Sequence, residues 1–457
     1  MNQELWNRIL AFDLDNPPSE YGFSTRLAKE NFWTQEFTNQ AILEYKKFMY
    51  LAATSKFMVS PSEIIDVVWH QHLIFTKSYQ DFCKILGKQI QHIPSTHNRE
   101  DYEKFFKAKE RTINFYEKEF GLQPKNIWSF HGMFESLNLI KAKFKLRTFI
   151  IYGILTFICM LVPAYFLLKP IYIQIDNPIF IFGLIFLTIL TLFALDFYNK
   201  YKLEEIVSSF DPTSFVFDLQ PFELVYLKTQ KLNDVINGTI NELIHNGVIK
   251  INDKNKVELV KNKATVNNSQ LQATTSLKEL GTSYYTDLSN KLVTKPIFWN
   301  IQNSLDAFRK YFNKSKKFGN IFYFNFVILN LLVLFSFTRI ITGILRDKPV
   351  FLIVNLTIVL VIVTVVFLQR LTKQISTITI PDYYKNQILP TRQIENNWQW
   401  SFFLLGNDVL TVSFVPIVNN VHKTNNSAAG GNSCGSNSGS SCGSSCSSCG
   451  GCGGCGS

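Results

Sequence analysis

The sequence predicts a mainly α-helical membrane protein with four transmembrane helices in two hairpins. Two observations lead to this fold class. Four runs of 18 to 20 residues contain no charged side chain. In the first 130 residues, apolar side chains recur instead at the spacing of amphipathic helices. At 457 residues, the chain is also long enough for two or three domains.

The apolar runs are long enough to cross a lipid bilayer. Because a helix rises about 1.5 Å per residue, twenty residues reach about 30 Å, the thickness of the hydrocarbon layer. Four such runs favour membrane spans over the buried helices of a soluble protein. We expect transmembrane hairpin 1 in residues 148–198 and hairpin 2 in residues 321–368, with spans at 149–168, 178–195, 321–338 and 350–368.

Basic residues beside the spans indicate the orientation of the chain. The four flanks outside the hairpins hold fourteen Lys and Arg residues, whereas the two short turns hold four. By the positive-inside bias, these flanks are cytoplasmic. We therefore expect a multi-pass protein of the inner (plasma) membrane with cytoplasmic N- and C-termini. The second turn, which contains Arg339, Arg346 and Lys348, opposes this assignment.

Few polar side chains occur within the spans. We expect Asn325, Asn330 and Asn355 to hydrogen-bond across the second hairpin and to hold helices together. No acidic or basic residue lies in the middle of a span, which disfavours a pump or an ion channel. Six of the eight cysteines lie in the last 24 residues, a distribution unlike that of a secreted, disulfide-stapled domain.

Residues 1–130 predict an all-helical cytoplasmic domain, followed by a basic juxtamembrane segment at 131–147. Helical spacing predicts a helix over residues 41–53. Ser60 is expected to cap the next helix, with Pro61 in its first position and Glu63 closing a capping box. Further helices are expected from Thr76 to Gly87 and over residues 99–120.

The best candidate site lies in the stretch DVVWHQHLIFTKSYQDFC, residues 66–83. Asp66 and His70 are four residues apart and share a helix face, which lets the carboxylate hold one imidazole tautomer. His70 and His72 lie about 200° apart around a helix, so both face one ion only if the helix ends there. One hypothesis is a zinc site, its ligands His70, His72, Cys83 and His92 and its supporting residues Asp66 and Tyr79. The alternative is a helical core with a hydrogen-bonded histidine.

A specific pattern runs through this region: Tyr-x-x-Phe, then Pro-Ser-x-x-Ile-Asp-x-x-Trp-His-x-His, then Tyr and Cys, Gly, and His-x-Pro. It resembles the glycine-rich-domain-containing-protein-like family over about residues 35–120. The resemblance implies no reaction that transfers to this chain. The matching positions are Tyr45, Phe48, Pro61, Ser62, Ile65, Asp66, Trp69, His70, His72, Tyr79, Cys83, Gly87, His92 and Pro94.

Residues 199–320 predict a winged-helix-like cytoplasmic domain. Helices are expected at 221–228 and 232–246, followed by Gly247, a β-hairpin over 248–260 and two more helices. The candidate recognition helix, 232–246, has no Lys or Arg, and only Asn233 and Asn237 suit base contacts. An interaction or scaffold module is therefore favoured over DNA binding.

The C-terminal region divides into a connector at 369–424 and a low-complexity tail at 425–457. Apolar runs on either side of Gly406, Asn407 and Asp408 predict a β-hairpin, with the bilayer surface as one resting place. The Gly- and Ser-rich tail cannot bury a core, so disorder is expected. Its thiols, a weaker candidate metal site or lipidation site, are Cys446, Cys449, Cys452 and Cys455.

This layout resembles uncharacterised bacterial membrane proteins with a Gly/Cys-rich terminus, which implies no known activity. No catalytic constellation stands out, so a non-enzymatic scaffold that displays cytoplasmic domains to protein partners is the first functional hypothesis. The alternatives are a metal sensor or enzyme built on the His/Cys cluster, and a membrane-tethered DNA-binding regulator. The predicted partners are the lipid bilayer and unidentified proteins.

Overall fold

The computed structural model describes residues 1–93, 99–260, 267–391 and 397–420. The chain forms two compact units. We call residues 1–133, 218–304 and 397–420 the extramembrane unit, and residues 134–217 and 305–391 the membrane unit. Nearly all of the described secondary structure is helical, as predicted.

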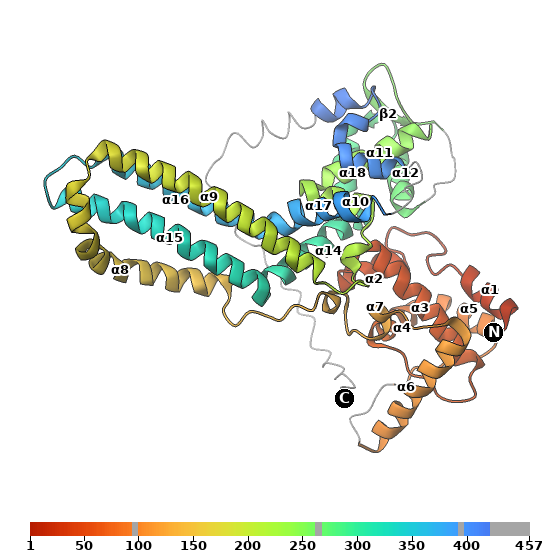
Figure 1. The fold of residues 1–457 in the computed structure, drawn as a ribbon. Helices are drawn as coiled ribbons and strands as arrows, with labels where there is room; N and C mark the ends of the chain where they lie inside the picture. The colour runs from red at the N-terminus through yellow and green to blue at the C-terminus, as the bar shows by residue number, and fades with distance from the viewer. Residues whose placement is uncertain (94–98, 261–266, 392–396, 421–457) are drawn as a thin grey trace. The chain divides into compact units, whose positions relative to one another are not determined.

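The membrane unit contains four long apolar helices, which confirms the four predicted spans as helices long enough to cross a bilayer. Figure 1 shows them lying beside one another. They are α8 (Leu146–Gln174), α9 (Asn177–Ser208), α15 (Lys316–Ile344) and α16 (Phe351–Gln374). Helix α15 is the most buried of the four and packs against the other three, whereas α8 exposes most of its apolar side chains.

Polar contacts between these helices differ from the prediction. Asn325 on α15 pairs with Asn199 on α9 through two amide hydrogen bonds of 2.7 and 2.9 Å. The second hairpin is instead bridged by Ser336 and Thr357, whose hydroxyl oxygens are 2.5 Å apart. Asn325 was therefore assigned to the wrong helix pair, because a sequence does not reveal which face of α15 meets which neighbour.

Helix α16 does not end at residue 368, after which the polar connector was predicted to begin. It continues through η3 (Ile375–Thr379), α17 (Ile380–Tyr383) and η4 (Tyr384–Ile388), so that one apolar helix spans 38 residues, Phe351–Ile388. The wider π-helical turns of η3 and η4 lie on either side of Pro381, which lacks a backbone N–H. The remaining short elements of this unit are η1 (Met133–Leu137) and η2 (Phe215–Phe217).

In residues 1–93 and 99–133, the extramembrane unit forms seven helices: α1 (Gln3–Ala11), α2 (Phe23–Asn31), α3 (Gln35–Thr54), α4 (Glu63–Ile74), α5 (Thr76–Leu86), α6 (Arg99–Phe120) and α7 (Lys125–Trp128). Helix α4 begins two residues later than predicted. Its cap is Ser62, whose hydroxyl oxygen accepts a 3.3 Å bond from the Ile65 N–H. Gly87 and Gly121 adopt positive φ where α5 and α6 end.

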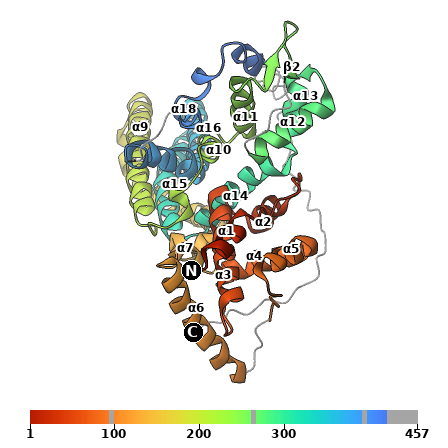
Figure 2. The ribbon, with the colours of Figure 1, turned by 90° about the vertical axis from the view of Figure 1, so that its right-hand side faces the viewer.

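The middle segment of the extramembrane unit mixes helices with a small antiparallel sheet. Its elements are α10 (Pro221–Thr229), α11 (Leu232–His245), β1 (Ile249–Ile251), β2 (Lys256–Leu259), α12 (Asn268–Leu280), β3 (Ser283–Tyr284), α13 (Tyr285–Val293) and the first half of α14 (Pro296–Asn313), whose second half belongs to the membrane unit. The strand order is β1-β2-β3, and Figure 2 shows α11, α12 and α13 beside β2. Three helices follow β2 before the third span, one more than predicted.

The predicted C-terminal β-hairpin is wrong. The segment forms helix α18 (Trp398–Leu405) and the 3-10 turn η5 (Gly406–Val409), with Gly406 at a φ of 67° between them. Phe402 and Phe403 are buried, and α18 packs against α10. An apolar run of eight residues fits a buried helix as well as a strand, so its length could not decide.

Three stretches of sequence, separated by the spans, join within the extramembrane unit. The Gln35 N–H donates a 2.9 Å bond to the Glu223 carboxylate, and the Lys295 ammonium pairs with Glu20 at 2.7 Å. The C-terminal stretch is attached through the Gln399 amide, which donates to Glu242 at 3.0 Å. The extramembrane unit is thus built from the segments before, between and after the two hairpins.

Candidate metal site

Helix α4 presents two faces with different roles. Its inner face buries Ile65, Val68 and His72 in the core of the N-terminal helices. Asp66 and His70 lie on its outer face, one helical turn apart. The sequence therefore folds one histidine of the WHQH stretch inward and the other toward solvent.

A third polar side chain reaches this outer face from the segment after α5. Gly87 ends α5 in the left-handed conformation and turns the chain back toward α4. The Tyr79 hydroxyl donates to the Ile90 carbonyl and accepts a 3.1 Å bond from the Trp69 indole, which fixes the returning segment. His92 then packs edge-on against Trp69, with ring centroids 4.7 Å apart.

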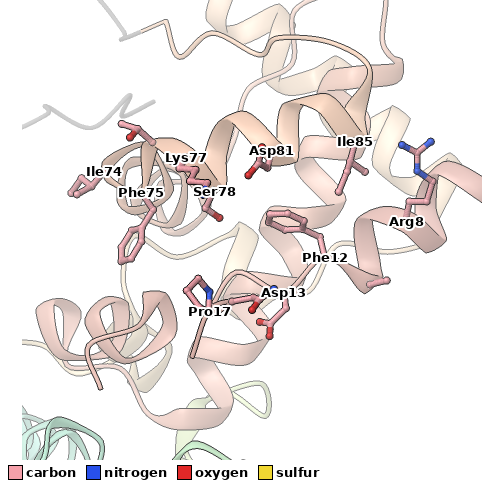
Figure 3. A pocket seen from close by; sticks show the side chains of 13 residues that line it. Arg8, Phe12, Asp13, Pro17, Ile74, Phe75, Lys77, Ser78, Asp81 and Ile85 are labelled. Atoms are coloured by element: carbon pink, nitrogen blue, oxygen red, sulfur yellow. The ribbon is translucent and has the colours of Figure 1, made fainter. Parts of the chain in front are cut away.

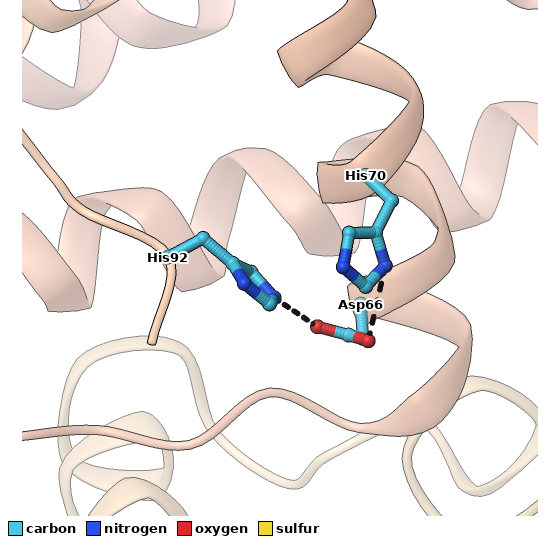
Figure 4. A group of neighbouring side chains, drawn as sticks. All are labelled: Asp66, His70 and His92. Carbon is cyan, nitrogen blue, oxygen red and sulfur yellow. Dashed lines mark hydrogen bonds and ion pairs between the residues drawn. The ribbon is translucent and has the colours of Figure 1, made fainter. Parts of the chain in front are cut away.

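Asp66, His70 and His92 form a compact donor cluster (Figure 4). His92 Nε2 lies 2.9 Å from Asp66 Oδ1, and His70 Nδ1 lies 3.3 Å from Asp66 Oδ2. One ligand atom from each of the three residues lies within 4.8 Å of the others. The side chains of Asp66, His70 and His92 are 31%, 47% and 16% exposed, so the cluster is open to solvent on one side.

This donor set fits a divalent transition metal. In a tetrahedral zinc site, donors at about 2.0 Å from the ion lie about 3.3 Å from one another. The two distances to the Asp66 carboxylate, 2.9 and 3.3 Å, are close to that spacing. Three protein ligands leave one coordination position for water or for a ligand from outside.

The four ligands predicted from the sequence do not meet. His72 is fully buried on the opposite face, where Nδ1 lies 2.8 Å from the Tyr45 hydroxyl and Nε2 lies 3.1 Å from Ser78 Oγ. Both ring nitrogens therefore have partners within the protein. Cys83 is buried in the same core, close to Tyr79.

Of the predicted set, His70 and His92 come together, and Asp66 joins them as a potential direct ligand rather than a supporting residue. The spacing of Asp66 and His70 was the usable signal, because residues four apart share a helix face. Tyr79, which was predicted as a supporting residue, anchors the segment that carries His92 through its hydrogen bond to the Ile90 carbonyl. The tail thiols Cys446, Cys449, Cys452 and Cys455 lie outside the described residues.

A surface hollow of about 890 Å³ lies between the end of α1 and α5 and includes Phe12, Asp13 and Ser78 (Figure 3). Ser78 is next to a histidine, but the direction of their hydrogen bond matters. The tautomer of His72 sets the direction of its bonds to the Tyr45 hydroxyl and to Ser78 Oγ. Nε2 could take the serine proton only in the tautomer that carries its own proton on Nδ1 and donates it to Tyr45.

Comparison with protein families gives a match in the N-terminal part of the chain. Residues 22–127 match a family model described as UCP032817-like. The matched range contains Asp66, His70 and His92 but covers less than a quarter of the chain. No curated protein and no solved structure matches the chain.

Proposed function

We propose that this chain is a four-span membrane protein whose extramembrane unit binds a divalent transition metal, zinc being the expected ion. Asp66, His70 and His92 are the proposed ligands. The observation that carries the proposal is their convergence from α4 and from the segment that Tyr79 anchors. In this role the protein is a metal-responsive scaffold rather than an enzyme.

The ligand types support zinc. Imidazole nitrogen and carboxylate oxygen are common zinc donors, and a three-ligand set with an open position suits an ion that also accepts a ligand from water or a partner. Binding replaces the polar contacts of Asp66 with His70 and His92 by metal bonds and joins the segment around His92 to α4. A partner protein would distinguish the metal-bound from the metal-free chain by the surface around Asp66, His70 and His92, which is open to solvent.

The metal experiment uses the full chain in detergent, with the six tail cysteines changed to serine so that they cannot compete for zinc. We expect one zinc per chain by calorimetry and a change in tryptophan fluorescence, because Trp69 touches His92. His70→Gln with His92→Gln should weaken binding at least about tenfold.

The matched control is His131→Gln, which removes an exposed imidazole paired with Glu63 at 3.1 Å. This variant should bind zinc like the parent chain. Equal zinc affinity in the parent and the double variant would refute the proposed site.

Membrane placement rests on a separate observation. Two hairpins are an even number of crossings, and the segments outside them hydrogen-bond to one another within one unit. This arrangement supports one membrane side for all three segments, and the basic flanks favour the cytoplasm of a cell bounded by an inner (plasma) membrane. Reporters active only outside the cytoplasm should stay silent when fused after residues 130 and 260, and activity at either position would reject this topology.

The winged-helix-like description of the middle segment is also a proposal. Its support is the order α10, α11, β1, β2. The same geometry argues against DNA reading. Asn237 on α11 is buried and its side-chain oxygen accepts a 2.5 Å bond from the Tyr285 hydroxyl, so it is unavailable to a base edge. The segment thus better suits a scaffold than a DNA-binding regulator.

A further inference from the structure

Two basic segments lie side by side in the membrane unit, each just before a spanning helix. Lys141 and Ser315 form an antiparallel β-bridge. The Ala142 N–H donates to the Lys314 carbonyl at 2.9 Å, and the Lys316 N–H donates to the Ile140 carbonyl at 2.7 Å. These bonds hold the start of α8 next to the start of α15.

The paired segments carry a concentrated positive charge. Seven basic side chains are exposed there: Lys141, Lys143, Lys145, Arg147, Lys314, Lys316 and Lys317. Neither residues 136–175 nor residues 307–346 contain an Asp or a Glu. Within the described part of the chain, none of the seven has an ion pair with a carboxylate, and Lys317 donates to the Ser209 hydroxyl at 2.8 Å. The charge is therefore not neutralised by neighbouring acids.

The helix termini add to this positive field. The N-terminus of a helix carries a partial positive charge, so acidic residues are favoured there and basic ones are not. Neither α8 nor α15 has an acid in its first turn, and instead Arg147 and Lys316 stand there. Helix α8 also lacks a side-chain cap. The N-terminus of α15 is capped by Ser315, so the uncapped N-terminus of α8 adds its partial positive charge to that of the seven cations.

The position of this surface points to a lipid as the source of the anion. Tyr323 donates from its hydroxyl to the Phe144 carbonyl at 2.6 Å, and its ring packs at a tilt against Phe149, with ring centroids 4.0 Å apart. Phe144 is 57% exposed next to the basic residues. Cations beside aromatic rings at the start of two apolar helices match the headgroup level of a bilayer. A phospholipid whose phosphate lies here would have its acyl chains along α8, whose apolar side chains are exposed.

We propose that residues 141–147 and 314–317 bind the headgroup of an anionic glycerophospholipid. The inference depends on the four spans but not on the metal site, so each can fail alone. Basic pockets between spanning helices bind such headgroups through Lys and Arg. The site also gives the two hairpins a shared contact with the membrane surface, because one segment precedes α8 and the other precedes α15.

The test measures lipid preference in the intact chain. Protein reconstituted in a mixture of phosphatidylcholine and phosphatidylglycerol is extracted in mild detergent, and retained lipids are counted by native mass spectrometry. A basic residue at a membrane surface raises the preference for anionic lipid about fivefold. The parent chain should therefore retain phosphatidylglycerol in at least tenfold excess over its share of the mixture. The site variant, which should lose this preference, combines Lys143→Gln, Lys145→Gln, Lys314→Gln and Lys316→Gln.

A control variant removes the same charge from exposed positions of the extramembrane unit, through Lys56→Gln, Lys77→Gln, Lys107→Gln and Lys254→Gln. It should retain phosphatidylglycerol like the parent. The proposal is overturned if the parent shows no preference, or if the site and control variants lose it equally. Displacement of the lipid by millimolar inorganic phosphate would also overturn it, since that result assigns the surface to a soluble anion.

Discussion

His70 and His72 stand two residues apart on α4 and meet opposite environments. The ring of His72 is buried between Tyr45 and Ser78, whereas nearly half of the His70 side chain is exposed beside Asp66. A spacing of two places side chains almost opposite each other on a helix, so only one can face a shared ion. The spacing rule thus predicted that the pair would separate, but not which histidine would face inward.

The burial of His72 predicts a pH-dependent stability. Burial lowers the pKa of His72 from 6.5 to about 4, because the charged ring is poorly solvated there. The unfolded chain takes up a proton below pH 6.5 and the folded chain does so only near pH 4. Stability is therefore full above pH 6.5 and falls by about 3 kcal/mol as the pH drops toward 4.

The measurement is thermal unfolding of the full chain in detergent, followed by tryptophan fluorescence. All seven tryptophans lie in the extramembrane unit, so the signal reports on that unit. His72→Gln should show a smaller loss of melting temperature between pH 7 and pH 4.5 than the parent. His131→Gln, an exposed control, should keep the parent's pH dependence. A parental slope in His72→Gln would contradict the assignment.

Glu223 predicts the opposite slope in the same pH range. Burial raises its pKa from 4.5 to about 7, although the N–H groups of Gln220 and Gln35 donate to its carboxylate. A group with a raised pKa stabilises the fold below its unfolded value and loses that contribution as the pH rises through its folded value. The contribution is therefore full below about pH 4.5 and lost toward pH 7.

Glu223→Gln separates this effect from that of His72. The variant loses one of two backbone hydrogen bonds at every pH, which lowers its melting temperature throughout. Its melting temperature should then fall more steeply than the parent's between pH 7 and pH 4.5, because only the His72 effect remains. A pH profile parallel to that of the parent would mean that Glu223 titrates normally in the folded protein.

At the scale of elements, the long and strongly patterned segments were predictable and the short ones were not. An uncharged run of about twenty residues matches the thickness of the hydrocarbon layer, and in a helix it satisfies its own backbone hydrogen bonds. All four spanning helices could therefore be predicted from the sequence. Helix α18 has eight residues, and its conformation depends on packing against α10 rather than on its own periodicity. The same limit applied to the start of α4, where two serines compete as caps.

The docking of α18 predicts the effect of a single added methyl group. Gly238 on α11 has no side chain, and a Cβ there would lie 2.6 Å from the Phe222 ring and 2.8 Å from the Phe402 ring. Gly238→Ala should therefore destabilise the unit by about 1–3 kcal/mol, despite the higher helix propensity of alanine. Gly183→Ala on α9 is the control, because a Cβ there meets nothing within 4 Å. An unchanged melting temperature in Gly238→Ala would show that α18 does not pack closely on α11.

At the scale of the whole molecule, the extramembrane unit is built from three stretches of the chain, and the membrane unit is built from the two stretches between them. Asn300 donates to the Thr25 carbonyl at 2.9 Å, so the middle segment contacts the N-terminal one. Thr411 donates from its N–H to Asn241 at 2.7 Å, so the last described segment contacts the middle one. This closure could not be predicted from the sequence, because no local pattern records a contact between residues separated by two spans.

Closure predicts that the extramembrane unit loses stability when its last segment is removed. Phe402, Phe403 and Phe414 are buried in it, and truncation after residue 396 leaves their partners on α10 and α13 exposed to water. Each buried phenylalanine contributes about 1.5–3 kcal/mol of transfer free energy, so the loss should exceed that of any single substitution above.

The matched chain ends after residue 420 and keeps every described contact of the unit. Its melting temperature, read from the tryptophans that both chains share, should equal that of the parent, whereas the shorter chain should unfold at a much lower temperature. Equal melting temperatures for the two truncations would mean that the last segment is only attached to the unit, and would remove one support for placing the segments on one side of the membrane.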